Sequence, residues 1–90
     1  MRVTWDPAKA RSNAAKHGVS FEEAASALLD PFALEAPDLL DPARTIVIGM
    51  SGRQRVLFVV TVILEGPSAV RIVSARKASP AQRRKYEETP

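Results

Sequence analysis

The sequence contains no cysteine and only one histidine, His17. The lack of cysteine excludes disulfide bonds and thiolate metal ligands, and no pair of acidic residues has the spacing of metal ligands on one rigid element. A glycine-rich phosphate loop and a recognisable serine–histidine–aspartate set are also missing. We therefore expect no metal and no other cofactor, so a site must be built from cations, one histidine and one tyrosine.

Long apolar runs are missing too. The longest, residues 56–64, is interrupted by Thr61 and is less than half as long as a membrane-spanning helix, which needs about 20 residues. Residues 1–7 lack the apolar core of a signal peptide. With 90 residues, 46% of them hydrophobic and 26% charged, the chain is predicted to form one domain over residues 1–90. We expect a soluble cytoplasmic protein without membrane contact.

Acidic residues are absent from a long stretch near the C-terminus. Between Arg71 and Lys85 there are six basic residues and no acidic one, whereas Glu22 to Asp41 holds six acidic residues and no lysine or arginine. The net charge is only +3, so its distribution is more informative than its sum. The pattern predicts an acidic side and a basic side, and the basic side favours a polyanionic partner.

Two helices are predicted near the N-terminus. Asp6-Pro7 reads as an N-cap followed by proline at the first helical position, and Gly18 can close the helix in the left-handed conformation, which predicts a helix over residues 7–17. Lys9, Asn13, Lys16 and His17 share one face of it. Ser20-Phe21-Glu22-Glu23 has the spacing of a capping box, which opens a second helix that should end at Asp30-Pro31.

The rest of the chain reads as strands followed by one helix. Strands are predicted at residues 44–50, 55–64 and 70–77, with short strands at 3–5 and 32–34. Residues 51–54 form a hairpin turn in which Gly52 supplies the positive φ. Ser79-Pro80-x-Gln82 opens a third helix that runs to about Glu88. These elements predict an α+β fold, a small antiparallel sheet of three to four strands with two N-terminal helices and one C-terminal helix, the helices on one face.

The strand at residues 70–77 carries the most unusual charge pattern. Counting by two places Arg76 on the same face as Val70 and Ile72, where an apolar residue would be expected. A lone terminal arginine would indicate only that the strand runs out into solvent. The basic residues that follow, from Lys77 to Lys85, instead favour a cation-binding surface for an anionic ligand.

Cations, one histidine and one tyrosine suit metal-free cleavage of RNA. The ribose 2′-hydroxyl attacks the neighbouring phosphorus when a base takes its proton and an acid protonates the leaving oxygen, while cations stabilise the charged phosphorane. Arg76 and Arg53, helped by Lys77, are candidates for the last role, because guanidinium donors match phosphate oxygens. His17 and Tyr86 are candidates for proton transfer, although the tyrosine pKa would need lowering by surrounding cations.

Each candidate also has a structural alternative. His17 can stabilise a helix C-terminus, Tyr86 can be packed on an amphipathic helix, and Arg53 can serve solubility alone. Arg83 with Glu87, and Arg84 with Glu88, have the spacing of surface ion pairs. The basic residues expected to bind the RNA backbone are Lys16, Arg55, Lys77, Arg83 and Arg84.

Four blocks of the sequence form a recognisable set: Trp5-Asp6-Pro7-x-Lys9, Asn13-x-x-Lys16-His17-Gly18-Val19-Ser20-Phe21-Glu22-Glu23-Ala24, Ile48-Gly49 and Val70-Arg71-Ile72-Val73-Ser74-Ala75-Arg76-Lys77-Ala78. Together they resemble the BrnT toxins of bacterial type II toxin–antitoxin systems. The resemblance implies a RelE-like fold, a ribonuclease that arrests translation, and neutralisation by a BrnA-type antitoxin that binds DNA, represses the operon and forms a heterotetramer with the toxin.

The same resemblance assigns the arginine that closes the Ser-Ala-Arg block to Arg76, and a second basic residue to either Arg53 or Arg55. One position departs from the family, because relatives commonly have glutamate where this chain has Gln82. A different class of function stays open: a non-catalytic module that binds nucleic acid or a protein partner through the same basic face. The small number of aromatic residues argues against a single-strand binder of the stacking type.

Overall fold

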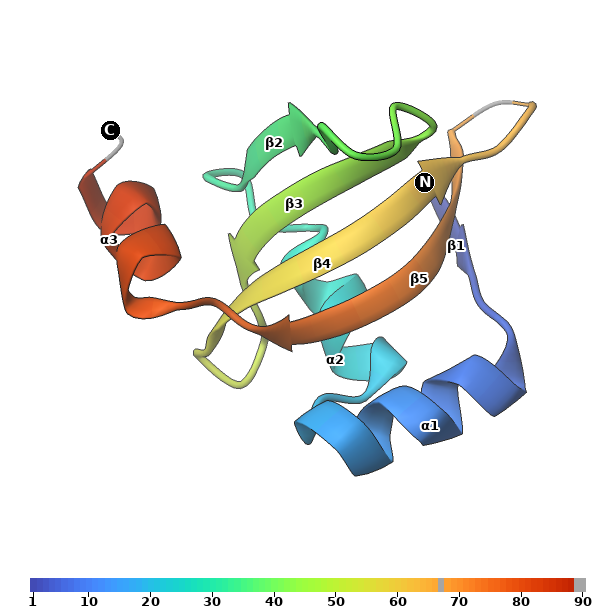
Figure 1. Ribbon diagram of the computed structural model, residues 1–90, viewed down its shortest axis with the longest axis horizontal. Helices are drawn as coiled ribbons and strands as arrows, with labels where there is room; N and C mark the ends of the chain where they lie inside the picture. The colour runs from blue at the N-terminus through green and yellow to red at the C-terminus, as the bar shows by residue number, and fades with distance from the viewer. Residues whose placement is uncertain (67, 89–90) are drawn as a thin grey trace.

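The computed structural model describes residues 1–66 and 68–88, which form a five-stranded sheet and three helices (Figure 1). The order along the chain is β1 (Arg2–Thr4), α1 (Pro7–His17), α2 (Phe21–Ala27), β2 (Leu34–Pro37), β3 (Arg44–Met50), β4 (Val56–Ile63), β5 (Ala69–Lys77) and α3 (Pro80–Glu88). The α+β class and the predicted bounds of α1 and β3 are confirmed. Among the described residues, no helix is both long and apolar enough to cross a membrane.

The predicted number of strands is wrong, since the sheet has five strands in the order β1-β5-β4-β3-β2. The three central strands form the expected antiparallel meander, but β1 adds to β5 in parallel and β2 adds to β3 in antiparallel orientation. The short strand predicted at residues 3–5 is present as β1 at 2–4, whereas the one predicted at 32–34 is wrong except for Leu34, because β2 covers residues 34–37. β2 also contains Pro37, a residue that reads as loop but is tolerated at a sheet edge.

The helix ends follow the predicted capping chemistry. The Asp6 carboxylate accepts from the Ala8 N–H at 2.9 Å, and Gly18 ends α1 with a φ of +70°. At α3, the Gln82 backbone N–H donates to the Ser79 hydroxyl at 3.2 Å and the Gln82 side-chain Oε1 accepts from the Ser79 N–H at 2.9 Å, which completes a capping box. These ends are set by neighbours in the sequence, which is why they could be predicted.

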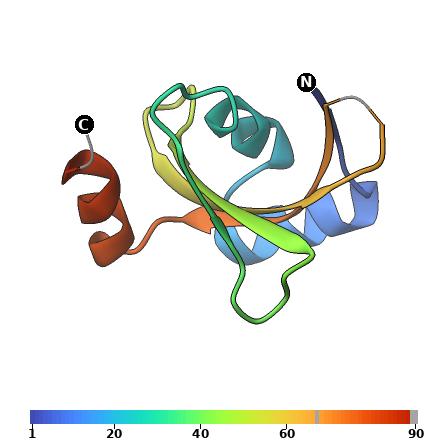
Figure 2. The same ribbon diagram turned by 90° about the horizontal axis from the view of Figure 1, so that it is seen from above.

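The main core lies between the sheet and the two N-terminal helices. Figures 1 and 2 show α1 and α2 on one face of the sheet and α3 at one end of it. Phe21 of α2 is fully buried, and its ring meets Trp5 edge-on with 6.1 Å between centroids. A Cβ added at Gly49 would lie 2.6 Å from the Ala27 carbonyl oxygen, so glycine permits the close approach of α2 to β3. Because α3 contributes nothing to this core, the expectation of three helices on one face is not met.

A β-bulge in β5 changes the direction of Arg76. Val60 pairs with Ser74 but Thr61 pairs with Ile72, so Val73 is an extra residue in β5. Ile72 and Ala75 therefore both face the core, each 1% exposed, and Arg76 lies on the opposite face beside Phe58. The prediction that Arg76 shares a face with Val70 and Ile72 is wrong, because a bulge shifts the period-two count by one residue.

The turn predicted at residues 51–54 is formed differently than expected. In the β3–β4 turn the positive φ belongs to Gln54, at 62°, rather than to Gly52, and the Ser51 N–H donates to the Arg55 carbonyl oxygen at 2.8 Å. In the β4–β5 turn Gly66 has a φ of 101°, while Pro67 lies outside the described residues. The β3–β4 turn carries Arg53 and leads directly into Arg55, so it places two of the predicted site residues.

Candidate active site

A buried carboxylate joins α2 to the β3–β4 turn. The Glu23 side chain is 4% exposed and forms a two-pronged ion pair with Arg55, whose Nε donates at 2.9 Å and whose Nη2 donates to the second oxygen. The Ser51 hydroxyl donates to the same carboxylate at 2.7 Å. Arg55 also donates to the Gly18 carbonyl oxygen at 3.2 Å. Of the predicted capping box only the Ser20 half forms, because Glu23 turns to Arg55 instead of back to Ser20.

The Arg55 bonds lower the pKa of Glu23 most strongly, and the Ser51 hydrogen bond adds to them against the effect of burial. Arg53 lies at the rim of this network, with Nη1 3.8 Å from Glu23 and a side chain that is 73% exposed. Of the two basic residues that the sequence left open, Arg55 is therefore held in an internal ion pair and Arg53 is accessible.

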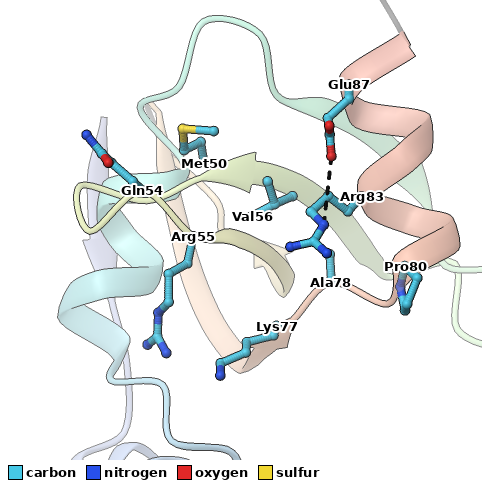
Figure 3. Close-up of a pocket in the computed structure, with 9 residues that line it drawn as sticks. All are labelled: Met50, Gln54, Arg55, Val56, Lys77, Ala78, Pro80, Arg83 and Glu87. Atoms are coloured by element: carbon cyan, nitrogen blue, oxygen red, sulfur yellow. Dashed lines mark ion pairs between the residues drawn. The ribbon is translucent and has the colours of Figure 1, made fainter.

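A cleft of about 580 Å³ lies at the end of the sheet between β4, the exit of β5 and α3. Figure 3 shows the side chains of Arg55 and Lys77 extending in the same direction, while Arg83 reaches toward them from α3. Glu87 is the one acidic residue in the lining, and it pairs with Arg83 across 3.7 Å on an exposed helix surface, where such pairs are weak. Lys77 is exposed, so this cleft brings together three of the residues predicted to bind RNA.

A second groove, of about 200 Å³, runs between α1 and β5 and contains Lys16 and His17. The predicted shared face of α1 is confirmed, because Lys9, Asn13, Lys16 and His17 all line it together with Ser12, Val73 and Ser74. β1 covers the edge of β5 only from Ala69 to Arg71. Beyond that, Asn13 takes the place of a strand: its Nδ2 donates to the Ala75 carbonyl oxygen at 2.8 Å and its Oδ1 accepts from the Ala75 N–H at 3.1 Å. These bonds hold the C-terminal half of α1, with Lys16 and His17, against β5.

Arg76 lies outside both grooves, on the face of the sheet opposite α1 and α2. Its guanidinium stacks 4.0 Å from the centroid of the Phe58 ring, and Nη1 donates to Gln82 and to the Lys77 carbonyl oxygen, each at 3.1 Å. Both bonds use the same nitrogen, which leaves the donors of Nε and Nη2 for a ligand. Gln82 is thus a neutral partner that orients Arg76 without neutralising its charge.

Tyr86 is held by an acid instead of being surrounded by cations. Its hydroxyl donates to Asp30, which also accepts from the backbone N–H groups of Met50 at 2.8 Å and Phe32 at 2.9 Å. The Asp30 hydrogen bond, together with burial and the Asp30 charge, raises the pKa of Tyr86 to about 12. This is the opposite of the change that a role in proton transfer requires. Tyr86 instead attaches α3 to the segments around Asp30.

The Tyr86 contact predicts an unusual titration. Because Tyr86 is the only tyrosine, its phenolate absorbance should appear with a midpoint near pH 12, and Asp30→Asn should move the midpoint toward 10.0. A raised folded-state pKa stabilises the fold below the ordinary value and loses that effect as the pH rises through the folded value, so α3 should detach only in strong alkali. Trp5 fluorescence reports whether the core stays folded during the titration. A wild-type midpoint near 10 with the core intact would show that the contact is absent.

A known protein family and a solved structure are similar to this chain. Residues 5–82 match the family described as ribonuclease toxin, BrnT, of type II toxin–antitoxin system. The chain belongs to the BrnT toxin family. The crystal structure of the ribonuclease toxin BrnT from Brucella abortus is similar over 88% of this chain and 97% of that one, with 28% sequence identity and a TM-score of 0.71. No curated protein sequence matches the chain.

The BrnT match divides the candidate residues into two groups. Residues 5–82 include Lys16, His17, Arg53, Arg55, Arg76 and Lys77. Arg83, Arg84 and Tyr86 lie beyond the matched residues, in the last two turns of α3. Membership of a type II toxin–antitoxin family implies an RNA substrate and an antitoxin partner.

The sequence patterns of this BrnT-family chain do not identify Glu23, Asp30 and Phe58 as residues that shape the candidate site. Glu23 was read as part of a capping box and Asp30 as a helix terminator, whereas each organises one wall of the candidate site. Phe58 reads as one more apolar residue of a central strand, but it supports Arg76. The partners of all three are distant in sequence, so no local pattern could show them. Within residues 1–66 and 68–88, no three histidine, cysteine, aspartate or glutamate side chains form a group that could hold a metal ion.

Proposed function

We propose that this protein is the toxin of a type II toxin–antitoxin system and acts as a metal-independent endoribonuclease that cleaves RNA and so inhibits translation. The observation that carries the proposal is the BrnT match over residues 5–82, which contains six of the nine predicted site residues. The described structure supports it by gathering cations at one end of the sheet. We propose that cleavage takes place in the bacterial cytoplasm, where the RNA substrate is found.

The proposed reaction is an intramolecular transesterification, in which phosphorus exchanges its bond to the 5′-oxygen for a bond to the 2′-oxygen. A base takes the proton of the ribose 2′-hydroxyl, the 2′-oxygen attacks the adjacent phosphorus, and the bond to the 5′-oxygen breaks as that oxygen gains a proton. The products are a 2′,3′-cyclic phosphate and a free 5′-hydroxyl. Cations lower the barrier by stabilising the extra negative charge of the phosphorane.

The geometry supports different roles for the cations. Arg76 is held by Phe58 and Gln82 with donors of Nε and Nη2 available, which suits stabilisation of the phosphorane. Lys77 and Arg83 in the cleft, helped by the exposed Arg53, would bind the RNA backbone next to it. Arg55 would act mainly by fixing the turn, since Glu23 and Gly18 occupy its guanidinium.

His17 is the candidate for proton transfer, because imidazole is the side-chain type that exchanges protons most readily near neutral pH. Since Arg76 lies on the opposite face of the sheet, one phosphate can contact both residues only if the RNA passes over the edge of β5 that β1 leaves uncovered. His17 lies in the groove beside β5 with Lys16, which would hold a neighbouring phosphate. Tyr86 is no longer proposed for this step, given its bond to Asp30 and its raised pKa. We further propose that a BrnA-type antitoxin neutralises the toxin, forms a heterotetramer with it and supplies all of the DNA binding.

The direct test is cleavage of total RNA by the purified protein in the presence of a chelator. We expect cleavage with and without chelator, fragments that end in a 2′,3′-cyclic phosphate, and growth arrest on induction that co-expression of the antitoxin relieves. Cleavage that stops on chelation would contradict metal independence. RNA binding without any cleavage would favour the non-catalytic module instead.

A further inference from the structure

The face of β2–β5 opposite α1 and α2, here called the open face, is ordered into rows of side chains. The strand register places residues side by side across the sheet in three rows: Leu34, Ile48, Phe58 and Arg76; then Ala36, Ile46, Val60 and Ser74; then Arg44, Val62 and Arg71. The centre of the face is aliphatic and aromatic, and arginines occupy its border on β5 and at the start of β3. Such a face in a small protein needs a cover.

The described part of the chain covers the open face only at one end. α3 stands beside the Arg76 row, while Figure 1 shows β3 and β4 with no described helix in front of them. Leu34, Ala36, Ile46 and Ile48, with Glu35 and Lys85, line a hollow of about 300 Å³ on this face. Ile46, Ile48 and Val62 are only partly buried. The hollow is wide enough to take one apolar side chain of a partner.

The loop between β2 and β3 extends this apolar surface. Leu39 and Leu40 are 94% and 96% exposed, an unusual position for two adjacent leucines. The loop is nevertheless ordered, because the Asp38 N–H donates to the Arg44 carbonyl oxygen at 3.0 Å and the Asp41 carboxylate pairs with Arg44 at 3.3 Å. In Figure 2 the loop projects on the side of the sheet opposite α2, which is the side of the open face.

The chemistry of this surface selects one kind of occupant. A second copy of the chain would present the same rows bordered by arginines, and these rows contain no acidic residue to pair with Arg71 and Arg76. RNA would find hydrogen-bond donors mainly at the border of the face, because the centre of the face is aliphatic and aromatic. A polypeptide segment with apolar residues in its centre and acidic residues toward β5 complements both features.

We infer that the open face, together with Leu39 and Leu40, is the docking surface for an acidic, amphipathic segment of the antitoxin. This inference rests on the proposed function, which supplies the antitoxin. Apolar residues of the segment contact Ile46, Ile48 and the two loop leucines, and its acidic residues face Arg71. The docked segment also covers Arg76, so neutralisation follows from the loss of access to that guanidinium.

The test is isothermal titration calorimetry of the full-length protein with the purified antitoxin encoded beside it. We expect Arg71→Glu to weaken binding about tenfold or more and to reduce its salt dependence, and Leu39→Ser/Leu40→Ser to weaken it about tenfold. Both changes lie on exposed side chains, so the fold should be retained. Arg11→Glu and Leu29→Ser, exposed residues of the α1 and α2 side, are matched controls with expected wild-type affinity.

A second readout separates docking from catalysis. Cells that express either docking variant should stop growing even with the antitoxin present, because the variants keep the ribonuclease site. Wild-type affinity for both docking variants, or equal losses in the controls, would overturn the inference, as would the absence of any complex. A protein that binds the antitoxin through this face but cleaves no RNA would instead refute the proposed ribonuclease activity and leave the docking surface standing.

Discussion

Replacing Arg76 by alanine is expected to slow RNA cleavage about 100-fold or more, the usual effect of removing one donor that stabilises a developing negative charge. The Arg76 side chain is preorganised for this role. The Phe58 ring and the Gln82 side-chain Oε1 hold the guanidinium in place before a substrate arrives, and neither partner is an acid. Single-turnover cleavage of a short RNA measures the effect, with melting curves to confirm that the variant is folded.

Two further variants sharpen this prediction. Arg76→Lys keeps the charge but loses the forked donors and the planar stacking on Phe58, so it should restore only a small part of the rate. Arg11→Ala removes an exposed arginine from α1 and should cleave at the wild-type rate. A wild-type rate in folded Arg76→Ala would exclude Arg76 from the reaction. Lys77→Ala and His17→Ala would then test whether the cleft or the α1–β5 groove holds the scissile phosphate.

Gln82 is the neutral partner of Arg76 at a position where the resemblance to BrnT toxins leads us to expect glutamate. Glutamate at this position would place a carboxylate on Arg76 Nη1, where the present side chain places a neutral amide oxygen. A carboxylate partner would reduce the positive charge that Arg76 offers to a phosphate. The same amide closes the N-terminus of α3 by accepting from Ser79, so one residue both starts the helix and orients the arginine.

Local chemistry made much of the fold predictable. Asp6-Pro7, Gly18 and Ser79-Pro80-x-Gln82 each satisfy backbone groups within a few residues, and the bounds of α1 and α3 agree with what these signals indicate. The basic residues of the cleft were also identified, since a cluster of like charges is visible in the sequence itself. The four blocks that together resemble BrnT toxins led to the correct family.

The predictions that were wrong or incomplete concern features set by contacts between residues that are distant in the sequence. The bulge at Val73 is a property of the β4–β5 register, so counting by two along β5 alone put Arg76 on the wrong face. The partner of Glu23 lies 32 residues away and the partner of Asp30 lies 56 residues away. Glutamate in a capping box and aspartate before proline each have a sufficient local explanation, and for both residues that explanation concealed the more important contact.

Replacing Glu23 by glutamine is expected to destabilise the fold by about 3 kcal/mol, the lower end of the range for breaking a buried ion pair. The side chain is 4% exposed and joins α2 to the β3–β4 turn through Arg55, while the Ser51 hydroxyl donates to the same carboxylate. The amide keeps the shape but removes the charge that holds the guanidinium. A loss of this size is a large share of the total stability of a domain with 90 residues. Urea unfolding of both proteins measures it.

The effect should depend on pH in a direction that identifies its cause. The Arg55 bonds lower the pKa of Glu23 below its ordinary value of 4.5, so the carboxylate stabilises the folded state above that pH and ceases to do so as the pH falls through the folded-state pKa. The stability gap between wild type and Glu23→Gln should therefore be constant near neutrality and shrink in acid. Glu22→Gln, which changes the neighbouring exposed residue, should show almost no gap at any pH. A Glu23→Gln protein as stable as wild type at neutral pH would show that the ion pair does not hold the turn, and Arg55 would then be available to bind RNA.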